Sequence, residues 1–120
     1  MTLLRSAISI AAMALIGALA VPAMAGGTED GAPAFTEEFM NDPAVFAKGK
    51  EIWDEQCKFC HGKTAYPGKA PKLKPRKYTP EFVYNRVTKG FKGMPAWDEV
   101  YSQEERMSVT AFIMHKDFSN

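Results

Sequence analysis

The chain has 120 residues, 46% of them hydrophobic and 24% charged, with a formal net charge of +1. This length fits one domain and excludes two. The charge is nearly balanced overall, although it is unevenly distributed along the chain.

Residues 1–25 have the features of a cleaved secretory signal peptide. Arg5 gives a positive start, an apolar run follows over residues 7–21, and Pro22 ends it. The Ala-Met-Ala sequence at 23–25 offers the small residues that a signal peptidase requires. An uncleaved membrane anchor is the alternative, but a span needs about 20 apolar residues and this run is shorter. We therefore expect an exported, periplasmic protein without a membrane span after cleavage.

Residues 26–42, rich in Gly, Ala and Pro at their start, are predicted to form a loose leader before a domain at 43–120. A domain this small buries only about 60–65% of its chain surface, so its core is thin. Exported domains of this size often add disulfides or a cofactor. The chain has two cysteines, Cys57 and Cys60, and a bridge between them would close too small a loop to stabilise the fold much.

The first helix is predicted to run from Pro43 to about Cys57. Asn41 or Asp42 can cap it, and proline is favoured at the first helical position. Apolar residues recur at three- and four-residue steps, which indicates one buried stripe. These are Val45, Phe46, Gly49, Ile52 and Trp53.

The sequence Cys57-Lys58-Phe59-Cys60-His61 is the chemically informative motif. Two thiols three positions apart at a helix end can reach the two vinyl groups of a porphyrin, and the next histidine can then face the iron. A thioredoxin-like redox pair would follow a strand, and none is predicted here. A zinc site would need further ligands, and the one other histidine is His115. The motif therefore predicts one covalently attached haem c.

The rest of the chain is predicted to hold one irregular stretch and two helices. Residues 61–78 contain three prolines and two glycines among many lysines, so no regular element is expected. A second helix begins at residues 79–81 and ends before Gly90, and a Ser102/Glu105 capping box opens a third that extends to about Lys116. The third helix carries an apolar stripe of Met107, Ala111, Met114 and Phe118, flanked by Phe112 and Ile113. The fold class is all-α.

Residues 49–61 resemble the amino-terminal helix and haem motif of class I cytochromes c. In that family a glycine and an aromatic residue four positions later pack against the last helix, and Gly49 and Trp53 match them. Phe112 fits the aromatic position of the last helix. The resemblance covers residues 43 to about 116. It implies the class I fold, with about three main helices around one haem.

The resemblance also implies roles for residues outside the motif. Pro71, in Pro-Lys-Leu, matches a proline whose carbonyl holds the ligand imidazole. Residues 93–97 resemble the loop that supplies the second iron ligand, which makes His61 and Met94 the axial pair. Trp97 could donate its indole hydrogen to a haem propionate, or it could be a core aromatic that closes the pocket.

Met94 is also favoured by the residues themselves. Met107 and Met114 lie on the stripe of the last helix, where a core role is the better interpretation. His115 lies among polar residues near that helix end and is expected to be exposed, and Met40 lies in the acidic leader. Met94 alone lies in a tight loop, between Gly93 and Pro95.

A His/Met iron has no open coordination position, which argues for single-electron transfer in a respiratory chain rather than for an enzyme. Two alternatives remain. The domain could be a bound haem c subunit of a larger oxidoreductase, or a small haem enzyme or gas sensor, which would need an open iron site.

The partner is predicted from charge. Residues 58–92 hold ten basic residues against Glu81, which suits an acidic docking partner, although a solvated lysine-rich loop explains the same count. Nucleic acid fits badly with export. The loops at 66–73 and 91–98 resemble small periplasmic cytochromes associated with quinoprotein (PQQ-dependent) alcohol dehydrogenases. A general carrier between a membrane complex and a terminal enzyme is the alternative, and a monomer is expected. The predicted basic rim is Lys58, Lys63, Lys69, Lys72, Lys89 and Lys92.

Overall fold

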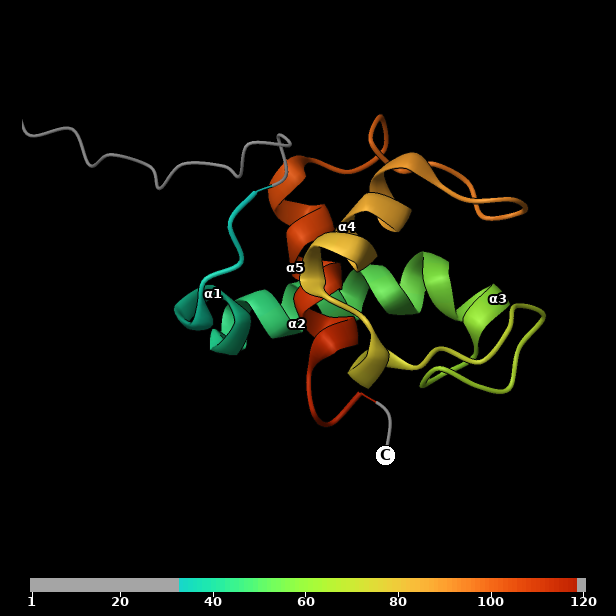
Figure 1. The fold of residues 1–120 in the computed structure, drawn as a ribbon, viewed down its shortest axis with the longest axis horizontal. Helices are drawn as coiled ribbons and strands as arrows, with labels where there is room; N and C mark the ends of the chain where they lie inside the picture. Colours follow the sequence, from blue (N-terminus) through green and yellow to red (C-terminus); the bar gives the residue numbers. More distant parts are fainter. Residues whose placement is uncertain (1–32, 119–120) are drawn as a thin grey trace, which may run out of the picture.

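A computed structural model describes residues 33–118, so the predicted signal peptide lies outside the described residues. The described chain is helical, contains no strand and has one isolated β-bridge (Figure 1). The predicted all-α class is confirmed. Within these residues, no helix has the length and apolar character needed to cross a membrane. The elements are α1 (Glu37–Asn41), α2 (Pro43–Ile52), the π-helix η1 (Trp53–Cys57), α3 (Lys58–His61), the 3-10 helix η2 (Pro75–Lys77), α4 (Pro80–Lys89) and α5 (Gln103–Met114).

The first predicted helix is present and extends beyond its expected end. The Asp42 carboxylate accepts a hydrogen bond from the Ala44 N–H at 2.7 Å, and Pro43 occupies the first position of α2. Helical backbone then continues through η1 and α3 as far as His61. Gly62 ends it with φ of +84°, a conformation that favours glycine.

The other two predicted helices begin where their caps indicate. The Thr79 hydroxyl accepts from the Phe82 N–H at 3.2 Å, and α4 ends at Gly90. Ser102 and Glu105 form both hydrogen bonds of a capping box, at 3.2 and 3.0 Å. The last helix ends at Met114, slightly before the predicted boundary.

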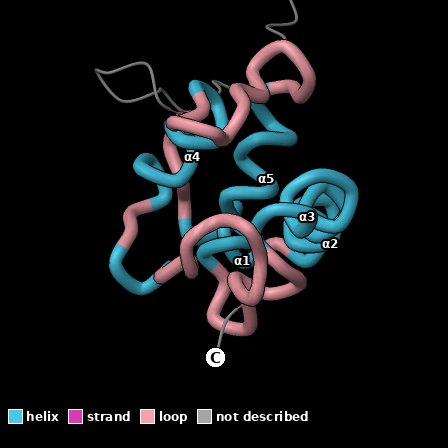
Figure 2. Tube along the Cα trace, turned by 90° about the vertical axis from the view of Figure 1, so that its right-hand side faces the viewer, coloured by secondary structure: helices cyan, strands magenta, loops and turns pink. Residues whose placement is uncertain are grey.

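Helix α5 lies between α2 and α4, and Figures 1 and 2 show it crossing α2. The crossing is close because Gly49 has no side chain. A Cβ there would clash with the Ser108 carbonyl oxygen and lie 2.7 Å from the Phe112 Cβ. Phe46 packs on the same Phe112 ring, with centroids 5.1 Å apart. The predicted contact between the first and last helices is therefore present.

The core is centred on Trp53, which is 1% exposed. Its ring packs edge-on against Phe118, at 4.8 Å between centroids. Its indole N–H donates to the Lys63 carbonyl at 2.9 Å. The buried face of α5 differs from the predicted stripe, since residues 108–113 are buried whereas Met107 and Met114 are only partly buried.

Two short helices lie in segments that we expected to be irregular. Within the described part of the 26–42 leader, Thr36 caps α1, and Phe35 packs against Tyr84 of α4 at 5.8 Å. This end of the leader is therefore ordered against the domain, because its aromatic side chain has a partner that the local sequence does not reveal. Residues 61–78 contain the single 3-10 turn η2, which buries Pro75.

Candidate functional site

The candidate site begins where η1 passes into α3. The wider π turn ends at Cys57, and the following turn carries Cys60 and His61. Single π turns inside α-helices occur frequently at functional sites. Both thiols are free; Cys57 is partly buried and Cys60 is exposed. One thiol therefore faces the interior while the other is open to solvent.

The Cys57 thiol is not a reactive thiolate. Burial, and secondarily the neighbouring Cys60, raises its pKa to about 12. Redox-active cysteine pairs work by the opposite shift, since the thiolate is the attacking species. The environment of Cys57 therefore argues against the thioredoxin-like alternative.

His61 has a buried nitrogen without a partner. Its Nδ1 atom accepts or donates no hydrogen bond within the described chain. Burial also lowers the pKa of the imidazole, which favours the neutral form that binds metals. The ring lies 5.8 Å from that of Trp53. A buried polar nitrogen without a hydrogen bond is costly, so His61 Nδ1 requires a partner that it does not have in this structure.

The loop after His61 folds back over the motif. The Ala70 N–H donates to the Cys60 carbonyl at 2.8 Å. A Cβ at Gly62 would clash with the Pro67 carbonyl oxygen, and one at Gly68 would clash with the Cys60 carbonyl oxygen. These two glycines were not among the predicted site residues, although glycine after a helix end is a readable signal. They allow the loop to lie directly against the motif.

Pro71 is exposed and follows the residue that bonds to Cys60. Because His61 Nδ1 has no hydrogen bond, it does not donate to the Pro71 carbonyl in this structure. The role that the resemblance gives to Pro71 stays a prediction.

Met94 lies in a tight hairpin. Phe91 and Met94 exchange two backbone hydrogen bonds, each 3.0 Å long, and Lys92 at the turn has φ of +52°. Met94 is partly buried and packs against the core cluster that Cys57 and Trp97 also contact. The structure thus brings a thioether and one thiol of the motif to the same core.

The Trp97 backbone N–H donates to the carbonyls of Val87 and Thr88 at 3.1 and 3.3 Å, which ties the loop after Met94 to the end of α4. The Trp97 ring lies 5.9 Å from that of Tyr101. Its partial burial accommodates either of the roles considered for it.

The other candidate methionines lie on helices and not in a loop. Met107 and Met114 belong to α5, where Met114 also packs on the core cluster, and Met40 belongs to α1. His115, expected to be exposed, is partly buried: its ring is 4.5 Å from that of Phe46, and its Nδ1 accepts from the Asp117 N–H. Nowhere in residues 33–118 do three or more His, Cys, Asp or Glu side chains gather as a metal-binding cluster.

A model of a known protein family matches this chain. The family model described as "Cytochrome C oxidase, cbb3-type, subunit III" matches residues 44–113. A search of curated sequences gives no significant match.

Solved structures share the fold. Cytochrome cL from Hyphomicrobium denitrificans is 21% identical, with a TM-score of 0.58 over 67% of this chain and 52% of that one. Cytochrome cL from Methylophaga aminisulfidivorans is 20% identical, with a TM-score of 0.55 over 62% and 55% of the two chains. The c-type cytochrome SorU from Sinorhizobium meliloti is 28% identical, with a TM-score of 0.51 over 61% and 91%.

Proposed function

The chain belongs to the family of c-type cytochrome domains described as cytochrome C oxidase, cbb3-type, subunit III, and from this we propose that it is a single-electron carrier with one covalently bound haem c. One observation carries the proposal: two free thiols and a half-buried imidazole lie within five consecutive residues. Bound haem would supply an iron that changes by one electron between its ferrous and ferric states.

Cys57 and Cys60 would hold the haem through thioether bonds. Each bond adds the sulfur and hydrogen of a thiol across a vinyl double bond, so no atom is lost. His61 would be one axial ligand, and its neutral form is favoured by burial. Met94 would be the other, because the hairpin fixes its backbone and its side chain packs on the same core cluster as Cys57.

Pro71 and Trp97 would orient these groups. Pro71 follows the residue that is bonded to Cys60, and its carbonyl would accept a hydrogen bond from His61 Nδ1 in the haem-loaded protein. Trp97 would hold the Met94 loop against α4 and close the pocket.

The ligand pair of His61 and Met94 would favour electron transfer over catalysis. With nitrogen on one side and a thioether on the other, the iron would have no position for a substrate. The alternatives, a small haem enzyme or gas sensor, require that position to be open. As a carrier, the protein would act in the periplasm after signal cleavage, as a monomer. By the resemblance of its loops, it would take electrons from a quinoprotein alcohol dehydrogenase and pass them to a respiratory acceptor.

The ligand assignment is tested with Met94→Ala, using Met40→Ala and His115→Gln as matched controls. We expect Met94→Ala to keep its haem, to lose the sulfur–iron charge-transfer band of the ferric spectrum and to bind carbon monoxide in the ferrous state. Both controls should keep the band and exclude carbon monoxide. Loss of the band in a control, with an unchanged Met94→Ala spectrum, would move the ligand to that residue. Carbon monoxide binding by the unmodified protein would favour the enzyme or sensor alternative.

A further inference from the structure

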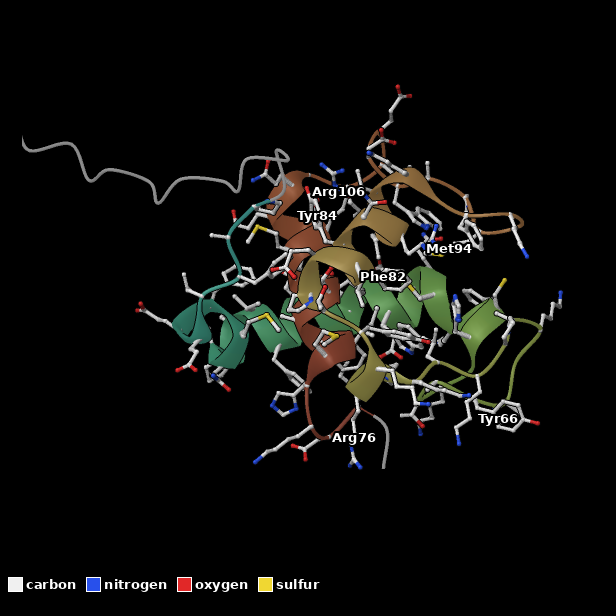
Figure 3. The ribbon with its side chains drawn as sticks, in the orientation of Figure 1. Tyr66, Arg76, Phe82, Tyr84, Met94 and Arg106 are labelled. Carbon is white, nitrogen blue, oxygen red and sulfur yellow. The ribbon has the colours of Figure 1, made fainter. Side chains whose placement is uncertain are left out.

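A row of aromatic and basic side chains runs from α4 to the Met94 hairpin, with Arg86 partly buried and Phe82, Phe91 and Lys92 exposed. The Arg86 guanidinium carbon lies 3.9 Å from the centroid of the Phe91 ring and 5.1 Å from that of Phe82. The Lys92 ammonium lies 5.4 Å from the centroid of the same Phe91 ring. These four residues, Phe82, Arg86, Phe91 and Lys92, are called the aromatic–arginine patch below. Figure 3 shows Phe82 on α4 and Met94 on the loop that follows it.

Packing within the described chain does not cover the two phenylalanine rings of the aromatic–arginine patch. Phe91 is 50% exposed and Phe82 is 44% exposed, although both are large apolar side chains. Arginine held between aromatic rings loses little further conformational freedom when it binds a carboxylate. Tyrosine, tryptophan and arginine dominate the energetics of protein interfaces, and exposed phenylalanines beside them add apolar contact area.

The charge of the patch has no counterpart within the chain. Arg86 forms no ion pair with a carboxylate in the part of the chain that the structure describes. Residues 86–92 contain Arg86, Lys89 and Lys92 and no acidic residue. Lys58, by contrast, is close to Asp54, and Lys48 is close to Glu51 and Glu105. Within the described residues, Arg86, Lys89 and Lys92 are therefore free to meet an external acid, as are the unpaired basic residues of the 69–77 segment, but only the hairpin residues lie beside exposed aromatic rings on the Met94 loop.

The patch is also rigidly connected to the candidate iron ligand. Phe91 is bonded to Met94 through both backbone hydrogen bonds of the hairpin. Gly90 allows the sharp turn out of α4 with φ of +70°, and a Cβ there would press on the Met94 carbonyl oxygen. A partner bound at Phe91 would thus contact the same hairpin that carries Met94, the residue that we assign as an iron ligand.

We propose that the aromatic–arginine patch is the anchor on which an acidic redox protein docks. A partner carboxylate would pair with Arg86, and an apolar side chain of the partner would cover the Phe82 and Phe91 rings. One electron would then cross between the partner's redox centre and the iron, with no proton transferred and no bond made or broken. This inference rests on the proposed function, and it replaces a diffuse lysine rim by one specific site.

The test is an NMR titration of the haem-loaded ferrous protein with a peptide of eight glutamates, at low ionic strength. We expect the Arg86 Nε–H resonance to shift and Arg86→Gln to weaken binding by about tenfold, as an interface hot spot would. Arg86→Lys should weaken it almost as much, because lysine keeps the charge but loses the planar stacking. Lys77→Gln removes one charge from an exposed residue of η2 and should change the affinity less than about twofold.

Three results would overturn the proposal. Equal losses for Arg86→Gln, Lys69→Gln and Lys77→Gln would show that the basic block attracts acids only through its summed charge. A change of the visible spectrum or potential in Arg86→Gln, with peptide binding unaffected, would show that this side chain faces the haem. Arg86-dependent binding to anionic phosphatidylglycerol vesicles, without binding to the peptide, would assign the patch to a membrane surface. Failure of the proposed function is separate, since it appears as a protein without haem or without reversible one-electron chemistry.

Discussion

Substituting Gly49 by alanine should damage the fold at the point where α2 crosses α5. The added Cβ would clash with the Ser108 carbonyl oxygen and lie 2.7 Å from the Phe112 Cβ, where ordinary contacts begin near 3.4 Å. Overpacking of this kind costs about 1–3 kcal/mol. Alanine in a helix gains up to about 1 kcal/mol over glycine, which opposes the loss. Because one obstacle is backbone and cannot rotate away, we expect a net loss of about 2 kcal/mol.

For a domain of this size, that loss lowers the melting temperature by about 8–16 °C. The assay is thermal unfolding of the haem-loaded protein, followed by circular dichroism at 222 nm. Gly93→Ala is the matched control, because a Cβ there meets no heavy atom within 4 Å. The control should stay within about 4 °C of the unmodified protein. If Gly49→Ala melts within the same range, the helix crossing is not as close as described.

Three further results are expected. Replacing both Cys57 and Cys60 by alanine should give a largely unfolded chain in circular dichroism, because so thin a core relies on its cofactor; a cooperative melt would contradict this. Trp53→Phe removes the hydrogen bond to the Lys63 carbonyl and should cost about 1–3 kcal/mol in urea unfolding, and an unchanged midpoint would show that the bond contributes nothing. The backbone N–H of Ser102 holds the pKa of Glu105 below its ordinary value. The ionised Glu105 therefore stabilises the fold at pH values above the pKa of the unfolded state. This stabilisation is lost as the pH falls through the pKa of the folded state. The difference in melting temperature between the unmodified protein and Glu105→Gln should therefore shrink between about pH 6 and pH 3, and a constant difference would refute this.

Local signals predicted the parts of the fold that local chemistry determines. Asp42, Thr79 and Ser102 cap helices because their own side chains satisfy the first N–H groups, and this is visible in sequence. The burial of Phe118 is different. Periodicity placed Phe118 on the apolar stripe of the last helix, but α5 ends at Met114, and the edge-on contact of its ring with the distant Trp53 depends on the fold.

The candidate site likewise has a part that the local sequence predicts and a part that depends on the fold. Cys57, Cys60 and His61 lie within five consecutive residues, so their spacing was readable directly. The π turn that precedes them, and the stacking of Arg86 between Phe82 and Phe91, depend on how α4, the hairpin and the core meet. No short pattern encodes such a meeting of distant segments. The lysines appeared equivalent in sequence for the same reason, since only the fold shows which of them have acidic neighbours.

Electron transfer by one His/Met-ligated haem is tested by a spectroelectrochemical titration of the purified mature protein. We expect one haem per chain, a single reversible transition with a one-electron Nernst slope, and six-coordinate low-spin spectra in both oxidation states. A chain that matures without haem, a transition of two electrons, or a five-coordinate iron in either state would contradict it.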